Sequence, residues 1–245
     1  MTRYRLTVEY DGTGFVGWQR QSNGPSVQQV LEEAVTAFCG EVTVVQGAGR
    51  TDAGVHATGQ VAHVDIARSD DAETVAAALN YYLRPVPVAV LAASVVDTGF
   101  HARFSAVGRR YHYSILNRRA RPALDRDRVW WIPAPLDAAA MHAAAQLLVG
   151  KHDFTSFRAA NCQARSPIRT LSRLDVSRDG EVISIHAAAP SFLYHQVRNL
   201  AGTLKLVGEG KWQAADVETA LAARDRAAGG PTAPPGGLCL TGVEY

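Results

Sequence analysis

The chain has 245 residues, of which 47% are hydrophobic and 20% charged, and a formal net charge of +2. This composition is typical of a globular protein, and the length allows one large domain or two small ones. The longest apolar run, residues 86–96, is too short to cross a membrane, and no apolar signal segment precedes the first predicted strand. Three scattered cysteines exclude a disulfide framework and a zinc ribbon, so we expect a cytoplasmic protein.

The first half of the chain alternates predicted strands and helices. Ser26 and Gln29 predict a capping box for a helix that Gly40 ends. The predicted elements are a strand at Arg5–Tyr10, a helix at Val27–Phe38, strands at Val42–Val45 and Gly59–Ile66, a helix at Asp71–Leu83 and a strand at Val86–Val96. This order of strands and helices is the ferredoxin-like arrangement.

The second half again mixes strands with helices. Five apolar residues between Leu193 and Val207 repeat at intervals of 4, 3, 4 and 3, which predicts an amphipathic helix. The other predictions are a strand at Arg109–Leu116, a helix at Asp137–Val149, a loop at Lys151–Ser166, a hairpin of Leu171–Val176 and Glu181–Ala187, a helix at Gln213–Arg226, a linker at Gly229–Gly237 and a strand at Leu238–Val243. A boundary near residues 104–108 predicts α+β domains at 1–105 and 106–245.

The positive charge is concentrated in two segments. Residues 100–130 carry eight Arg and two Asp, a net charge of +6, and residues 151–173 carry one Lys, four Arg and one Asp, a net charge of +4. Arginine suits both phosphate binding and stacking on bases. The two clusters therefore predict a basic surface for a polyanion, against the alternative of solvated faces without a partner.

The segment Gly47–His56 is a short polar loop between two predicted strands. Its three glycines allow tight turns, and between them lie an arginine, a hydroxyl and a carboxylate, in Arg50, Thr51 and Asp52. Neither a dinucleotide-binding fingerprint nor a P-loop fits, because a strand follows instead of a helix and no Lys-Ser/Thr pair ends the loop. The alternative is that Asp52 only hydrogen-bonds the turn.

Three further positions have two interpretations each. Arg198 lies beside the apolar stripe of its predicted helix, so it either pairs with a carboxylate or packs its stem and extends its head to water. Tyr111 follows two arginines on a strand, so it is either a base-stacking platform or a core tyrosine. We expect the histidines to be structural rather than metal ligands; they are His56, His63, His101 and His112.

Six motifs span nearly the whole chain: Tyr10-Asp11-Gly12-Thr13-x-Phe15-x-Gly17-Trp18-Gln19, Gly49-Arg50-Thr51-Asp52-Ala53-Gly54-Val55-His56-Ala57, Phe100-His101-Ala102-Arg103-Phe104-Ser105-Ala106, Arg110-Tyr111-x-Tyr113, Phe192-Leu193-Tyr194-His195-Gln196-Val197-Arg198-Asn199 and Ala233-Pro234-Pro235-Gly236-Gly237-Leu238-x-Leu240. Together and in this order they closely resemble the tRNA pseudouridine synthase A family. Gln196, where the family often has Met, and Gly237 differ from the family pattern at positions it does not use for chemistry.

The resemblance implies two ferredoxin-like halves joined across a central catalytic cleft, and a homodimer. It implies a tRNA substrate in which uridines 38, 39 and 40 of the anticodon arm become pseudouridine, with no cofactor or metal and with neither DNA nor a membrane as partner. Asp52 is then the catalytic carboxylate, Arg50 displaces and holds the nucleotide, Tyr111 stacks beneath the uracil, and Arg198 pairs with Asp52. Arg110, Arg103 and His101 complete the implied substrate-binding set.

These roles suit the chemistry, because the base must leave the stack before an enzyme can reach it. Asp52 would attack the sugar or remove a proton from it, and the sequence leaves both routes open. One alternative is a non-catalytic RNA-binding or tRNA-folding module, which explains the basic clusters but not a paired Asp52 and Arg198. Another is an Asp-dependent glycoside hydrolase, which needs a second carboxylate that the sequence near Asp52 does not offer.

Overall fold

The computed structural model describes residues 1–245 and divides them into two units. The first unit contains residues 1–107 and 239–245, and the second contains residues 108–238. The chain thus leaves the first unit after Val107 and returns to it at Cys239. No helix of the structure combines the length and the apolar character that a membrane span requires.

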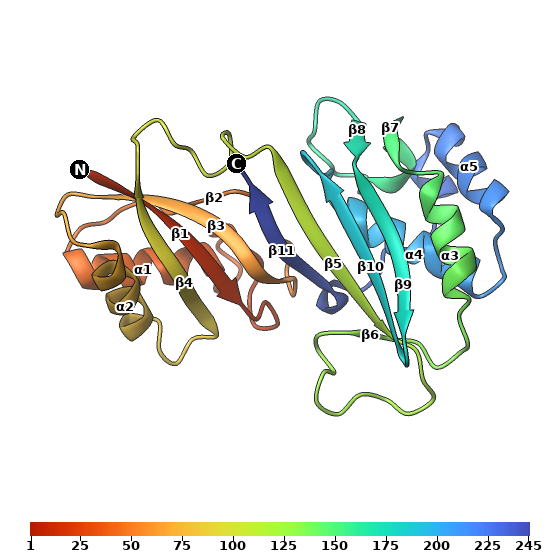
Figure 1. The fold of residues 1–245 in the computed structure, drawn as a ribbon, viewed down its shortest axis with the longest axis horizontal. Helices are drawn as coiled ribbons and strands as arrows, with labels where there is room; N and C mark the ends of the chain where they lie inside the picture. The colour runs from red at the N-terminus through yellow and green to blue at the C-terminus, as the bar shows by residue number, and fades with distance from the viewer. The chain divides into compact units, whose positions relative to one another are not determined.

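The first unit is an α+β structure built on a mixed sheet (Figure 1). Strand β1 lies between β4 and β3 and is antiparallel to both, while β2 is antiparallel to β3 and β11 is parallel to it. The elements in chain order are β1 (Thr2–Tyr10), α1 (Val27–Cys39), β2 (Gln46–Gly47), β3 (His56–Ile66), α2 (Ala72–Tyr82), β4 (Val88–Val96) and β11 (Leu238–Glu244).

The core of this unit follows from the period-two pattern of β1. Its alternate residues Tyr4, Leu6, Val8 and Tyr10 are all buried, whereas their neighbours are more exposed. Both helices contribute buried residues on one face: Leu31 and Val35 from α1, and Val75 and Leu79 from α2. This core supports the loop between β2 and β3.

Local signals set the ends of α1 as predicted. The Ser26 hydroxyl accepts a hydrogen bond from the Gln29 amide at 3.2 Å, and Gly40 ends the helix at φ 77°. The reciprocal half of the predicted capping box is absent, and the Gln29 side-chain amide donates to Glu33.

The predicted strand at Val42–Val45 is wrong. Side chains of α1 occupy the backbone groups of Val45: Glu32 accepts from its amide at 3.2 Å, and Gln28 donates to its carbonyl at 3.0 Å. Since these groups are already bonded, the segment does not join the sheet, and only Gln46–Gly47 pairs with β3.

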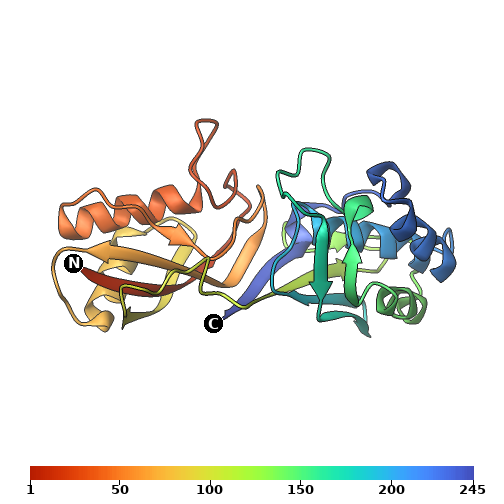
Figure 2. The same cartoon turned by 90° about the horizontal axis from the view of Figure 1, so that it is seen from above.

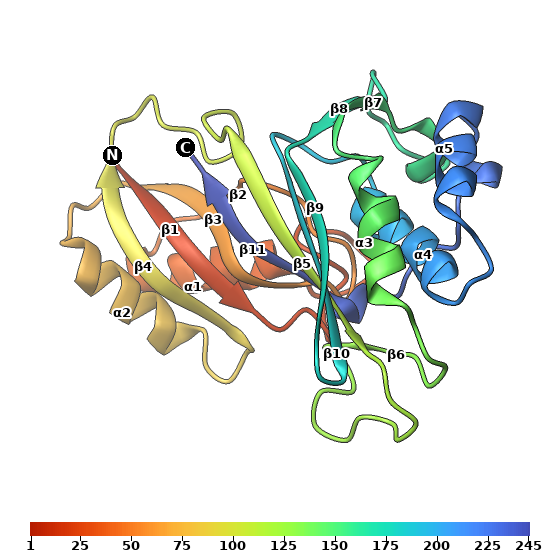
Figure 3. The same ribbon diagram turned by 45° about the vertical axis from the view of Figure 1, so that its right-hand side comes forward.

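The second unit has its own antiparallel sheet, in the order β5–β10–β9, with β6 parallel to β5 and a separate β7–β8 hairpin. Figures 2 and 3 show α3, α4 and α5 gathered on one side of the three-stranded sheet. The elements are β5 (Gly108–Leu116), β6 (Trp130–Trp131), α3 (Ala138–Gln146), β7 (Gly150–Asp153), β8 (Ile168–Leu171), β9 (Arg173–Asp179), β10 (Val182–Ala189), α4 (Gln196–Gly208) and α5 (Ala214–Ala223).

Most predicted elements of this unit are present, and several need correction. The predicted loop at Lys151–Ser166 contains most of β7 and a 3₁₀ turn at Thr155–Phe157, because Gly150–Asp153 pairs with β8. The helices expected to reach Val149 and Arg226 end earlier, at Gln146 and Ala223. The β9–β10 hairpin turns at Gly180, whose φ of 55° suits glycine.

Candidate active site

The polar loop of the first unit lies between β2 and β3, and its residues differ in their exposure to solvent. Arg50 is exposed, Asp52 is half-buried, and Thr51 and Val55 are buried. The Val55 amide donates to the Asp52 carbonyl at 3.1 Å, and Gly54 adopts φ 76°, so the chain turns sharply just after Asp52. The turn presents Asp52 before the chain enters β3.

The first motif of the sequence clamps this loop through the backbone. The Trp18 amide donates to the Thr51 carbonyl at 3.0 Å, and the Gly54 amide donates to the Phe15 carbonyl at 3.3 Å. Gly17 lies at φ 114°, and a Cβ there would meet the Thr51 carbonyl oxygen at 2.6 Å. Residues 10–19 and 49–57 are therefore two halves of one structural unit, which explains why both motifs occur together.

The histidine near the end of the second motif contacts the first motif as well. His56 is 7% exposed, and its Nδ1 accepts a hydrogen bond from the Gly12 amide at 3.0 Å. A Cβ on Gly12 would overlap the carbonyl oxygen of Val55, so this close approach requires glycine. This contact is consistent with the structural role expected for His56.

In the second unit, the C-terminal tail segment holds Arg198 of helix α4. The Arg198 Nε donates to the Ala233 carbonyl at 2.8 Å, and the Ala233 amide donates back to the Arg198 carbonyl at 3.1 Å. A Cβ on Gly202 would overlap the carbonyl oxygen of Pro231, so glycine lets the tail lie directly on the helix. Residues 229–237 are thus a packed strap on α4 rather than the predicted linker.

The tyrosine motif of β5 divides its side chains between two faces. Tyr113 is fully buried and donates to the Pro234 carbonyl at 2.8 Å; burial raises the pKa of its hydroxyl, which therefore stays a neutral donor. Tyr111 shares that face but is only half-buried, and its ring lies perpendicular to Phe192 with centroids 5.2 Å apart. Arg110, as its chain neighbour, points to the opposite face of the sheet.

The remaining predicted binding residues lie in the segment between β4 and β5. His101 Nδ1 accepts from the backbone amides of Arg103 and Phe104 at 3.1 and 3.3 Å, so its ring braces the loop as expected. The same ring packs on His63 with centroids 4.7 Å apart. Arg103 is exposed.

The structure therefore distributes the predicted site over both units. Asp52, Arg50, His101 and Arg103 belong to the first, and Tyr111, Arg110 and Arg198 belong to the second. Sequence reasoning missed two buried polar residues beside the Asp52 loop, Tyr10 and Gln60. The available signal was that Gln60 directly follows Gly59 and precedes Val61 within β3, close in sequence to the Asp52 loop.

The histidines carry pKa shifts that follow from packing. Burial, followed by the charge of Arg3, lowers the pKa of His63 to about 4. His112 stacks on His186 with centroids 4.8 Å apart, and burial lowers the pKa of both. Across residues 1–245, no group of three or more His, Cys, Asp or Glu side chains is placed to hold a metal ion.

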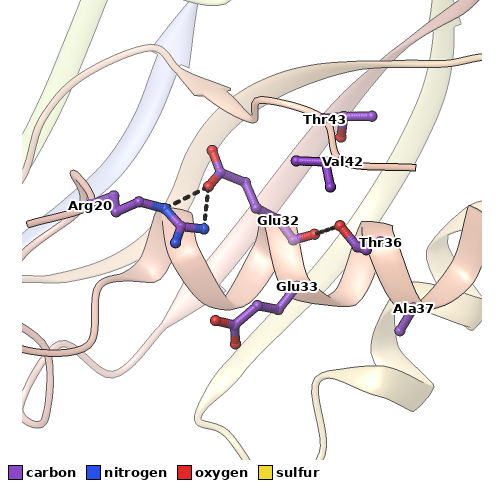
Figure 4. A pocket seen from close by; sticks show the side chains of 7 residues that line it. All are labelled: Arg20, Glu32, Glu33, Thr36, Ala37, Val42 and Thr43. Atoms are coloured by element: carbon purple, nitrogen blue, oxygen red, sulfur yellow. Dashed lines mark hydrogen bonds and ion pairs between the residues drawn. The ribbon is translucent and has the colours of Figure 1, made fainter. Parts of the chain in front are cut away.

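A hollow of about 410 Å³ lies elsewhere, over α1 and the segment that follows it (Figure 4). Its buried carboxylate, Glu32, is already paired with Arg20 at 2.7 Å and bonded to the Val45 amide. These groups secure the fold, and none of the predicted site residues lines the hollow. Its lining consists of Arg20, Glu32, Glu33, Thr36, Ala37, Val42 and Thr43.

Comparison with known proteins adds independent information to this geometry. The sequence model of a family described as tRNA pseudouridine synthase matches residues 6–105 and 144–245. A tRNA pseudouridine synthase A from Paramagnetospirillum magneticum is 63% identical over 245 residues, which cover 100% of this chain and 96% of the relative. Proteins of the same name from Rhodospirillum rubrum and Rhodospirillum centenum are 60% and 62% identical, again over 100% of this chain and over 88% and 100% of the relatives.

Proposed function

Since this chain belongs to the tRNA pseudouridine synthase A family, we propose that it isomerises uridine to pseudouridine at positions 38, 39 and 40 of the tRNA anticodon arm, with Asp52 as its catalytic carboxylate. The observation that carries the proposal is the Asp52 loop, which is clamped by the family's first motif and ends in a tight turn that presents a half-buried carboxylate. Such pre-organisation is what a catalytic group requires.

The proposed reaction balances without a cofactor. The bond between C1′ and N1 of the uridine breaks, the uracil turns, C1′ bonds to C5, the proton on C5 leaves and N1 takes up a proton, so that the product is an isomer of the substrate. Asp52 would either attack the sugar or remove a proton from it to release the base. Because the target base must first leave its stack, we assign its displacement to Arg50 and its support to Tyr111.

The proposed partner of the Asp52 carboxylate is Arg198. The carbonyl of Ala233 holds the Arg198 Nε, which fixes the direction in which the guanidinium extends. A fixed guanidinium is a suitable partner for a carboxylate, because its planar donors match the two oxygens. We assign Arg110, Arg103 and His101 to tRNA binding on the strength of their motifs.

The fold and assembly proposals rest on the same relationship. The first unit's sheet order β4–β1–β3, with β2 on β3 and two helices, supports a ferredoxin-like half. We propose a second such half, a catalytic cleft between the two, and a homodimer. We also propose a cytoplasmic location, which three free cysteines support.

Tritium release tests the proposed reaction. A tRNA transcript labelled with tritium at C5 of uridine is incubated with the protein, and a transcript with cytidine at positions 38, 39 and 40 is the matched control. We expect tritium in water from the first transcript and none from the second. Binding of both transcripts without tritium release would instead support a non-catalytic RNA-binding module.

A further inference from the structure

A chain of buried polar side chains runs beneath the Asp52 loop. Gln60, Tyr10 and Thr51 are 0%, 3% and 7% exposed. The Gln60 Nε2 donates to the Gly49 carbonyl at 2.9 Å and lies 3.4 Å from the Tyr10 hydroxyl, which is 2.8 Å from the Thr51 Oγ1. These bonds connect side chains of β1 and β3 to the loop, at the Gly49 carbonyl and at the Thr51 hydroxyl.

The donor and acceptor of each of these hydrogen bonds can be assigned. The Val61 amide donates to the Gln60 Oε1 at 3.1 Å, which fixes the orientation of the side-chain amide. The Gln60 Nε2 can only donate, so the Tyr10 oxygen accepts from it and gives its own proton to Thr51. Burial raises the pKa of Tyr10, so its hydroxyl stays protonated.

The two ends of this series of hydrogen bonds lie on either side of Arg50. Gly49 precedes it and is held through its carbonyl, while Thr51 follows it and is held through its hydroxyl, and Asp52 comes next. The anchored atoms belong to buried or half-buried residues, whereas Arg50 is exposed. The bonds to Gly49 and Thr51 thus hold the loop on its buried side, while the side chain of Arg50 stays exposed.

We propose that Tyr10 and Gln60 are positioning residues of the active site, which place Arg50 and Asp52 by holding Gly49 and Thr51 and do not themselves touch the tRNA. This inference rests on the proposed function. A buried hydroxyl or amide is costly unless it is bonded, and the two residues before Tyr10 on the same face of β1 are the apolar Leu6 and Val8. Tyr10 lies at the end of β1 that meets the loop, and its hydroxyl bonds to Thr51 of that loop.

Tyr4 provides a matched control on the same strand and the same buried face. It is 0% exposed, and its hydroxyl donates to the Asp70 carbonyl at 2.7 Å and accepts from the Asp70 amide at 2.9 Å. Tyr4→Phe and Tyr10→Phe therefore each remove one buried, doubly bonded hydroxyl. They differ in which loop loses its anchor.

The experiment measures single-turnover tritium release with saturating protein, together with the Kd for tRNA and the urea midpoint of unfolding. We expect Tyr10→Phe to release tritium at least about 10-fold more slowly than wild type, because displacement of a catalytic group by about 1 Å can cost about 100-fold. The Kd should stay within about twofold, since the tRNA-binding residues outside this loop are unchanged. Tyr4→Phe should lower the urea midpoint by a similar amount and leave the rate unchanged.

A second pair of variants keeps Tyr10 in place. Thr51→Val has nearly the same shape but loses the bond, and Thr51→Ser keeps the hydroxyl. We expect Thr51→Val to be slowed like Tyr10→Phe and Thr51→Ser to recover most of the rate. If Tyr10→Phe does not fold, this pair still tests whether the hydrogen bond between Tyr10 and Thr51 is needed for turnover.

Three results would overturn the inference. In the first, Tyr10→Phe and Thr51→Val turn over as fast as Tyr4→Phe. In the second, the Kd rises and the single-turnover rate does not fall, which would make Tyr10 and Thr51 binding residues. In the third, wild-type protein binds tRNA but releases no tritium, which refutes the proposed function itself and is distinguished from the other two by that wild-type measurement.

Discussion

Substitution of Gly202 by alanine should affect the stability of the protein in two opposite ways, one through helix propensity and one through contacts with the strap. Alanine has a higher helix propensity than glycine, which by itself would stabilise α4 by about 1 kcal/mol. A Cβ at this position, however, overlaps the carbonyl oxygen of Pro231 in the strap of residues 229–237. Carbon and oxygen atoms normally stay at least about 3.3 Å apart, so the strap must move away by more than about 1 Å.

That movement breaks the hydrogen bonds that hold the strap on α4. They are the two between Arg198 and Ala233, at 2.8 and 3.1 Å, and one from the Gly230 amide to the Thr203 hydroxyl at 3.0 Å. At about 1 kcal/mol each, their loss costs about 3 kcal/mol against the gain of about 1 kcal/mol from helix propensity. We expect Gly202→Ala to lower the free energy of unfolding by about 2 kcal/mol.

Thermal unfolding and turnover measure the two consequences. A loss of this size lowers the unfolding midpoint by about 4–8 °C for a chain of this length, and the displaced Arg198 should slow tritium release. Gly208→Ala, at the end of the same helix, is the matched control, because a Cβ there meets the flexible side chain of Met141 at 2.7 Å. A Gly202→Ala variant as stable and as fast as wild type would refute the placement of the strap.

Three further outcomes are expected. The lowered pKa of His63 means that the unfolded chain binds this proton first as pH falls, so its contribution to stability is full above about pH 6.5 and is lost progressively toward about pH 4. His63→Asn keeps an acceptor for the Ala102 amide and should show a smaller loss of stability in urea titrations across that range. If the exposed Arg119 and Arg121 contact phosphates, replacing both by glutamine should reduce the slope of log K against log salt for tRNA binding by about 1.8, and an unchanged slope would remove them from the interface. Arg198→Lys keeps the charge but loses the planar donor to the Ala233 carbonyl, so slower turnover with little change in the Kd is expected, and an unimpaired rate would count against the proposed orientation.

Local sequence signals predicted most of the elements, because the forces that form them are local. The apolar spacing of α4, the Ser26 cap, the Gly40 terminus and the turn at Gly180 each act within a few residues. The wrong strand at Val42–Val45 has a long-range cause. Glu32 and Gln28 of α1 bind the backbone of Val45, and no pattern within the segment itself reveals that competition.

In the candidate site, too, local features could be predicted from the sequence and long-range contacts could not. The Asp52 loop could be found from its glycines and polar residues, since they are adjacent in the sequence. The residues that hold it lie far away along the chain: Trp18 binds the Thr51 carbonyl, and Tyr10 binds the Thr51 hydroxyl. The same is true of the strap, which a Gly/Pro composition predicts as a linker although its contacts with α4 fix it in place.

The most direct test of the proposed function compares wild-type protein with Asp52→Asn on one sample of tRNA labelled with tritium at C5 of uridine. Asparagine keeps nearly the same shape and removes the charge, so tRNA should still bind with a similar Kd. The account predicts rapid tritium release by wild type and none by Asp52→Asn at saturating protein. Full release by Asp52→Asn would contradict the assignment of Asp52 as the catalytic carboxylate.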